Sequence, residues 1–277
     1  MKIAIRDNEK FYSFFSETGF YGIDVEFEDY RKKDYILSND YTRAIEEKRK
    51  IIEGAGLKIC QTHLTYYPGH LPPIGNGTYQ DYEAYMLKIL KKEIQLTNVL
   101  GCKVCAIHLY FEEDKEKSRD GNIALLSNLL PVAEKYNVVI AIENIYAKNY
   151  CDAHLSDSDD LLFYIDYFKN ENLKICFDTG HAIICGQNPV EMFKKIKKHV
   201  AALHLHTTVK NIDLHSLPYC ISYGEIINWD ELYKEIVNSG YRGAFNMEVE
   251  PPDKIGLSGE KAYYLLAYEI AKNIVGK

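Results

Sequence analysis

The sequence is poor in arginine and has no long apolar run. Only six of its 277 residues are arginine, against 27 lysines, and the net charge is −7 with an isoelectric point near 5.8. Binding to nucleic acids or anionic membrane surfaces depends on excess basic charge, so this balance argues against both partners. No segment approaches the roughly 18 apolar residues of a membrane span, and the start, MKIAIRDNEK, lacks the apolar core of a signal peptide. These absences predict a cytoplasmic protein with no nucleic-acid or membrane partner.

The cysteines give no sign of disulfides or of a zinc knuckle. Seven cysteines are scattered along the chain, and only Cys102 and Cys105 form a C-x-x-C pair. A structural zinc knuckle needs a second such pair. The cysteines are therefore expected to be packed, free thiols of a reducing compartment.

Short β-rich runs alternate with longer helical patterns along the whole chain. The predicted strands are residues 2–5, 22–26, 57–63, 103–108, 138–143, 173–178, 200–206 and 244–249. Apolar residues follow a helical period between them, for example over residues 81–99 and in a closing helix over residues 262–274. Such alternation is typical of βα units.

The connections after the strands are longer than those before them. The longest cover residues 27–41, 64–79 and 207–228. Long loops at the carboxyl ends of eight strands are typical of a TIM barrel, whose active site lies at that mouth. The sequence thus predicts one α/β domain over residues 1–277, a (β/α)8 TIM barrel. A doubly wound open sheet is the alternative, but no glycine-rich phosphate loop follows the first strand.

Ionisable residues occupy the carboxyl ends of seven predicted strands. With the two-residue period of a strand, the last inward-facing residues are Glu26, His63, His108, Glu143, Asp178, His204 or His206, and Glu248. Small residues precede several of them on the same face, such as Ala141 before Glu143. Because the strand ends of a barrel meet at one mouth, these side chains are expected to converge.

Carboxylates gathered at one mouth are costly in free energy unless a positive charge lies among them. A divalent cation is the natural counter-charge. A mixed set of oxygen and nitrogen ligands suits Mn²⁺, Zn²⁺, Co²⁺ or Mg²⁺ better than a thiolate site would. The sequence therefore predicts a divalent-metal centre held by strand ends.

Five segments carry recognisable motifs. They are IAIEN (140–144), CFDTGHA (176–182), LHLHTTVKNIDLH (203–215), INWDEL (227–232) and GYRGAFNMEVE (240–250). Together they resemble the xylose-isomerase-like TIM barrels, the superfamily of sugar and sugar-phosphate isomerases and epimerases that also holds endonuclease IV. The resemblance covers nearly the whole chain and is specific to the superfamily, not to one member.

The ketose 3-epimerase branch of this superfamily binds one divalent metal through two glutamates, an aspartate and a histidine. The resemblance implies that these ligands are Glu143, Asp178, His204 and Glu248, and that His181 contacts the substrate. His204 is preferred to His206 as the ligand because its spacing to Asp213 and His215 resembles a pattern common in relatives. His206 is then expected to support the ligands from behind, to bind substrate or to hold an additional metal ion.

Two positions depart from the epimerase pattern. Lys210 stands where epimerases have an arginine, and Asn149 stands where they have a substrate-binding glutamate. The endonuclease branch uses a larger set around three zinc ions. The resemblance implies as its counterparts His63, His108, Glu143, Asp178, His181, His204, Asp213, His215 and Glu248. One bound ion is preferred here, with two or three as alternatives.

A metal beside two carboxylates suits proton abstraction next to a carbonyl through an ene-diolate that the metal stabilises. With Glu143 and Glu248 as the catalytic pair, one removes a proton and the other returns it, which gives epimerisation. Transfer to the adjacent carbon gives isomerisation. We therefore expect a metal-dependent sugar or sugar-phosphate isomerase or epimerase with a small carbohydrate substrate. The segment THLTYYPGHLPPIGNGTY (62–79) is expected to cover the site, with Tyr66, Tyr67 and Tyr79 facing the sugar.

Other functions remain open. Loss of a hydroxyl from the same intermediate makes an inosose-type dehydratase an alternative. A phosphodiesterase resembling endonuclease IV is another, although a phosphate backbone is gripped by basic residues that this acidic chain lacks. A non-catalytic sugar-binding protein is a third. The number of subunits also stays open, with a homo-oligomer as one option.

Overall fold

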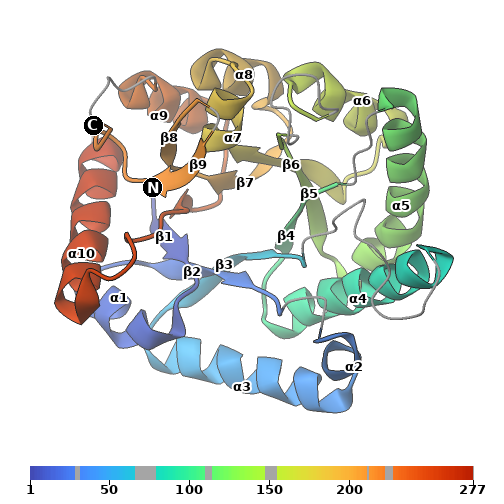
Figure 1. The fold of residues 1–277 in the computed structure, drawn as a ribbon, viewed down its shortest axis with the longest axis horizontal. Helices are drawn as coiled ribbons and strands as arrows, with labels where there is room; N and C mark the ends of the chain where they lie inside the picture. Colours follow the sequence, from blue (N-terminus) through green and yellow to red (C-terminus); the bar gives the residue numbers. More distant parts are fainter. Residues whose placement is uncertain are drawn as a thin grey trace.

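The computed structural model describes residues 1–28, 32–65, 79–109, 114–146, 155–210, 212–221 and 227–276. Eight parallel strands form its centre, in the order β10-β1-β2-β3-β4-β5-β6-β7, and helices surround them (Figure 1). A parallel bridge between Leu205, just after β7, and Met247 of β10 joins the two ends of this order. The predicted (β/α)8 barrel is confirmed.

The barrel strands lie close to their predicted positions. They are β1 (Ile3–Arg6), β2 (Gly22–Glu26), β3 (Lys58–His63), β4 (Val104–Ile107), β5 (Val139–Glu143), β6 (Leu173–Asp178), β7 (Val200–His204) and β10 (Phe245–Met247). Two of them are the same as predicted, and the others are shorter or shifted by one to three residues. Strand ends depend on pairing with neighbours, which a local pattern does not contain.

The helices cover the outside of the strands. They are α1 (Tyr12–Thr18), α2 (Lys33–Ile36), α3 (Asn39–Gly54), α4 (Tyr79–Val99), α5 (Lys115–Tyr136), α6 (Ser158–Phe168), α7 (Thr179–Ile184), α8 (Pro189–Ile196), α9 (Trp229–Asn238) and α10 (Gly256–Val275), with a 3₁₀ turn over Glu9–Phe11. Six of the described helices begin with a side-chain cap, from Ser38, Asp114, Asp157, Asp178, Asn188 or Asn228. None of the described helices has the length and apolar character needed to cross a membrane.

The two faces of the strands carry different side chains, as the alternation predicted. Ala106, Ala141, Cys176 and Ala202 form a small, fully buried cluster inside the barrel. On the opposite face, Ile142, Phe177 and Leu203 join the large apolar core beneath the helices. Small side chains inside the barrel leave room above them for the polar groups at the strand tips.

The segment after β7 differs from the prediction. The expected strand to residue 206 ends at His204, because the backbone N–H of His206 donates to the hydroxyl of Thr179 (3.0 Å) rather than to a neighbouring strand. The expected long loop that follows contains an antiparallel hairpin, β8 (Thr207–Val209) and β9 (Ile212–Ser216). This hairpin carries Asp213 and His215 to the barrel mouth.

Candidate active site

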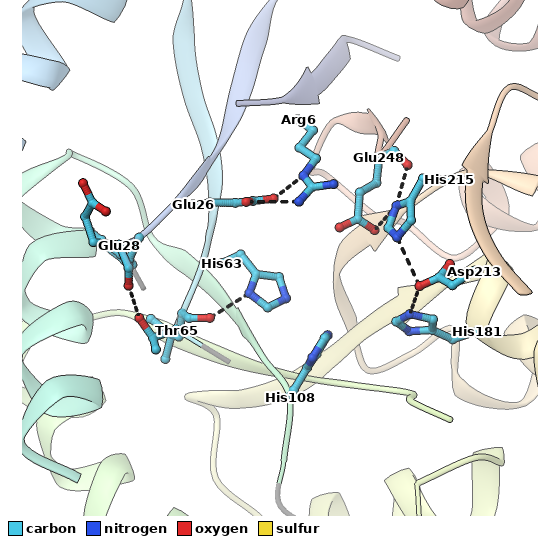
Figure 2. A pocket seen from close by; sticks show the side chains of 12 residues that line it. Arg6, Glu26, Glu28, His63, Thr65, His108, His181, Asp213, His215 and Glu248 are labelled. Atoms are coloured by element: carbon cyan, nitrogen blue, oxygen red, sulfur yellow. Dashed lines mark hydrogen bonds and ion pairs between the residues drawn. The ribbon is translucent and has the colours of Figure 1, made fainter. Parts of the chain in front are cut away.

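A cavity of about 430 Å³ opens at the carboxyl ends of the strands. Its lining includes residues from both halves of the barrel and from the hairpin, namely Arg6, Glu26, Phe27, Glu28, His63, Leu64, Thr65, His108, His181, Asp213, His215 and Glu248. Figure 2 shows the side chains of His63, His108, His181, His215 and Glu248 around a common space, with Asp213 between His181 and His215. A volume of this size fits a small metabolite.

Four side chains from strand ends converge beneath this cavity. Nδ1 of His204 lies 3.1 Å from Oε2 of Glu143 and 3.4 Å from Oε2 of Glu248. Oδ2 of Asp178 lies 4.0 Å from the same nitrogen. All four side chains are at most 10% exposed. The structure thus brings together the four residues that the resemblance implied as ligands of one metal.

Two further histidines face Glu143. Nδ1 of His63 lies 2.7 Å from the backbone oxygen of Leu64, so this nitrogen carries the proton and Nε2 is left as an acceptor. That Nε2 lies 3.3 Å from Oε2 of Glu143, and Nε2 of His108 lies 3.2 Å from the same oxygen. An acceptor nitrogen beside a carboxylate oxygen is unfavourable unless a proton or a cation lies between them.

Asp213 has a similar environment. Nδ1 of His181 lies 2.9 Å from the carbonyl of Asn144, and Nδ1 of His215 lies 3.1 Å from the carbonyl of Glu248. Both rings therefore turn Nε2 towards Oδ2 of Asp213, at 3.5 and 3.2 Å. Histidine ligands of metals commonly have their second nitrogen held in this way.

Several buried polar atoms of the site have no aligned hydrogen-bond donor within the described residues. They include both carboxylate oxygens of Glu143 and Oε2 of Glu248. Nδ1 of His204 likewise has no hydrogen-bond partner among the described residues. Oxygen and imidazole atoms that converge without donors fit a divalent cation of the Mn²⁺, Co²⁺ or Zn²⁺ type. Several overlapping groups of three residues could share an ion, for example His63, Glu143 and His204. Within each group, the three ligand atoms lie within 4.8 Å of one another.

The charged groups of the site shift one another's pKa values. Burial alone would raise the pKa of the Glu143 carboxyl, but the nearby imidazoles, first that of His204, lower it well below its usual range. Burial also opposes ionisation of Asp178, yet neighbouring imidazoles, first His181, lower its pKa to about 2. Burial disfavours the charged form of His63, but Glu143 raises its pKa to about 9. These carboxylates attract positive charge, which imidazole protons or a metal ion can supply.

The sequence analysis missed Asp24, which lies beneath the site. This buried residue of β2 has Oδ2 3.2 Å from Nε2 of His204, and the amides of Gln61 (2.8 Å) and Asn246 (3.0 Å) donate to the same oxygen. Asp24 therefore places a carboxylate beside the far nitrogen of His204, while Nδ1 faces the site. A signal was available, because Asp24 shares the inward face of β2 with Glu26, two residues later.

Arg6 was also missed. This residue ends β1, the strand with the weakest sequence pattern, and its guanidinium pairs with Glu26 and Glu250 (Figure 2 shows the Glu26 pair). Glu26 is thus a partner of Arg6 at the rim of the cavity rather than a member of the buried cluster. Both side chains line the cavity and offer hydrogen bonds to a polar ligand.

Other predicted residues lie elsewhere. Lys210 is exposed in the turn between β8 and β9 and is not among the lining residues, so the structure does not bring it to the site. Asn149, Tyr66 and Tyr67 lie outside the described residues, and so does the side chain of Tyr79. The proposed cover over the site is therefore still a prediction.

A family comparison agrees with this geometry. Residues 13–264 match the family model described as xylose isomerase-like TIM barrel. The chain belongs to this family. The motif-based resemblance is thereby confirmed.

Curated relatives of this xylose isomerase-like barrel match only part of their length. A segment of 133 residues is 30% identical to an uncharacterized protein of Methanocaldococcus jannaschii and covers 47% of this chain and 43% of that protein. Inosose dehydratase 2 of Bacillus cereus is 24% identical over 155 residues (51% of this chain, 49% of that one). A probable endonuclease 4 of Mycoplasmopsis pulmonis is 22% identical over 202 residues (69% and 65%).

Solved structures share the whole fold at low sequence identity. A D-psicose 3-epimerase crystallised in the presence of D-fructose superposes with a TM-score of 0.77 at 13% identity, and the match covers 100% of both chains. The IolI protein with a bound zinc atom gives a TM-score of 0.75 at 15% identity, over 100% of this chain and 98% of that one. These likenesses establish a common fold.

Glu93 of α4 anchors the cavity wall from below. This fully buried carboxyl accepts a hydrogen bond from the backbone N–H of Thr65 (2.8 Å) and also contacts the Thr65 hydroxyl, which donates to the carbonyl of Glu28 (2.8 Å). One hydroxyl proton cannot serve both oxygens, so a protonated Glu93 that donates to Thr65 satisfies every group. Burial raises the pKa of Glu93 to about 8, which agrees with that arrangement.

We expect Glu93 to make the protein less stable as the pH rises. Because the folded-state pKa of about 8 lies above the unfolded value, the stabilisation is complete below about pH 4.5 and is lost as the pH rises through 8. This group alone contributes a slope of up to about 1.4 kcal/mol per pH unit. Glu93→Gln keeps both hydrogen bonds without titrating. Urea unfolding at pH 6 and 8.5 should show a larger loss in the native protein than in the variant, and parallel losses would contradict the assignment.

Proposed function

We propose that this protein is a divalent-metal-dependent sugar or sugar-phosphate isomerase or epimerase. The observation that carries the proposal is the convergence of Glu143, Asp178 and Glu248 on Nδ1 of His204, within 3.1 to 4.0 Å. Two acidic groups held close together at one small cavity fit a reaction that moves a proton between faces or carbons of a sugar. The sugar-epimerase structures with the same fold support this choice.

The residues that would hold the metal are Glu143, Asp178, His204 and Glu248. A divalent cation held by them would supply polarisation of a carbonyl oxygen and stabilisation of the negative charge that develops on it. Their donor atoms are held by strand ends and buried contacts, which keep them in place without substrate. Oxygen-rich and imidazole ligands fit Mn²⁺, Co²⁺ or Zn²⁺, and a relative of the same fold has a bound zinc atom.

Glu143 and Glu248 are the proposed acid–base pair. Glu143 ends β5 and Glu248 follows β10, and these strands lie on different sides of β7 in the sheet. One carboxylate removes a proton from the carbon beside the carbonyl, and the other returns a proton to the opposite face, which inverts that carbon. Arg6 and Glu26 at the rim would bind sugar hydroxyls. Departure of a hydroxyl after the first step would give a dehydratase instead.

A second candidate function is metal-dependent phosphodiester cleavage. It is favoured by the additional cluster of His63, His108, His181, Asp213 and His215 around the same cavity, a larger ligand set than one ion needs. The proposed number of ions is therefore two or three if all these residues bind metal. The net charge of −7 disfavours a DNA substrate.

Hydrogen exchange with solvent tests the proposal. Protein loaded with Mn²⁺, Co²⁺ or Zn²⁺ is incubated in D₂O with a panel of ketoses, inososes and their phosphates, and deuterium is followed by NMR. We expect deuterium at the carbon beside the carbonyl of at least one sugar, and no exchange with Glu248→Gln. A parallel assay uses a duplex with an abasic site. Cleavage of this duplex without sugar exchange would contradict the proposal and support the second function.

A further inference from the structure

His206 is a fully buried histidine just beyond the end of β7. Its backbone is held at both polar atoms by one side chain. The hydroxyl of Thr179 donates to the carbonyl of His206 (2.6 Å) and accepts from its backbone N–H (3.0 Å). Thr179 opens α7, directly after Asp178. The segment that carries Asp178 therefore also fixes the position of His206.

Gly180 provides the space for the ring of His206. A Cβ atom at position 180 would lie 1.9 Å from Cε1 of His206 and 2.5 Å from Nε2, a separation that packed atoms do not adopt. Any side chain at position 180 would therefore displace the imidazole. This contact gives a physical reason for the Thr-Gly pair in the CFDTGHA segment.

The ring of His206 bonds to Asp178. Nε2 of His206 lies 3.1 Å from Oδ2 of Asp178, and the backbone N–H of His181 donates to Oδ1 of the same carboxylate at 2.6 Å. An ionised carboxylate only accepts hydrogen bonds, so Nε2 of His206 is the donor. Each oxygen of Asp178 thus has its own fixed donor, and the carboxylate cannot rotate freely.

We propose that His206 is a positioning residue that orients the Asp178 carboxylate for metal binding, through the hydrogen bond from Nε2. The inference rests on the metal centre of the proposed function but not on the reaction or the substrate. Groups that hydrogen-bond to metal ligands change metal affinity by about 10- to 100-fold when they are removed. His206 acts without contacting the ion.

A direct role as a ligand is the competing assignment. The ring of His206 stacks on that of His215, with centroids 4.4 Å apart and planes 7° apart, and ligand atoms of both lie within 4.8 Å of Glu248. However, Nδ1 of His215 faces the Glu248 carbonyl and its Nε2 faces Asp213. Nε2 of His206 is itself bonded to Oδ2 of Asp178, which favours the positioning role for His206.

Two substitutions of His206 test the proposal. His206→Gln keeps a donor near the position of Nε2, whereas His206→Leu removes it. Metal affinity is measured by competition with a chelator, metal content by elemental analysis, and coordination by the visible spectrum of the Co²⁺-loaded protein. We expect affinity about 10- to 100-fold weaker in His206→Leu, near-native affinity in His206→Gln, and native metal content for both at saturation. Circular dichroism of the metal-free variants verifies folding.

Gly180→Ala gives an independent test, because it moves the ring of His206 without changing its chemistry. It should weaken metal binding as His206→Leu does. Without a ring to displace, Gly180→Ala in a His206→Ala background should cause no further loss.

Three results would overturn the proposal. If His206→Leu binds metal with native affinity, His206 has no role in metal binding. If both His206 variants lose one equivalent of metal at saturation, His206 is a ligand. Native protein that takes up no metal overturns the proposed function as well. Inactivity on sugars, by contrast, affects only the proposed function.

Discussion

Glu143→Gln is expected to lower sugar turnover by about 10²- to 10⁴-fold, the range that one acid–base group contributes. The carboxylate lies 3.1 to 3.3 Å from nitrogens of four histidines, so glutamine also removes the negative charge around which the site is built. The metal-free variant should still fold, because glutamine has nearly the same shape and a buried charge is lost. Turnover and metal content are the measurements.

A matched control is Glu171→Gln, the same chemical change at an exposed position. Glu171 lies just before β6, at the end of that strand away from Asp178 and the site. It should leave turnover and metal content near native values. Glu248→Gln should resemble Glu143→Gln in turnover, since the proposed scheme requires both bases. Near-native activity in either site variant would exclude the two-base scheme.

Metal removal is expected to abolish activity and to lower the thermal unfolding midpoint by about 5 to 10 °C. Free metal at about 100 times its dissociation constant stabilises the folded protein by about 2.7 kcal/mol, and one kcal/mol corresponds to about 2 to 4 °C in a protein of this size. Dialysis against a chelator, calorimetry, and addition of Zn²⁺, Mn²⁺ or Co²⁺ one at a time provide the measurement.

The Glu143→Gln protein is the control for this experiment. Its midpoint should rise much less on metal addition, because it lacks the carboxylate that contacts the most histidines. A native midpoint that is the same with and without metal would contradict a metal centre at this mouth. Elemental analysis of the reloaded protein then gives the number of ions.

Much of the barrel was predictable because most βα units have a strong local signal. A strand buried on both faces reads as a short apolar run, and strict alternation assigns Glu143 and Asp178 to the inner face. The convergence of these tips follows from barrel closure, because parallel strands all end at one mouth. The candidate ligands were therefore accessible from spacing and family motifs.

The hairpin β8–β9 and the support beneath the site were not predictable in the same way. The hairpin forms inside a segment that reads as a loop, and His215 occupies it with a positive φ of 43°, a conformation with no clear sequence signal. The contact between Asp24 and His204 joins residues 180 positions apart (204 − 24). Such a pair depends on the register of separate strands.

The sequence by itself determined the alternating βα order, the inward and outward faces of the strands, and the acidic and imidazole residues at their ends. These features depend on the period of the backbone and on side-chain chemistry, which are local. Only the tertiary structure decided which nitrogen of each histidine faces a carboxylate, that Arg6 is neutralised at the rim, and that Gly180 makes room for His206. Those outcomes depend on distances of a few ångströms between distant segments, which are set when the barrel closes and its side chains pack.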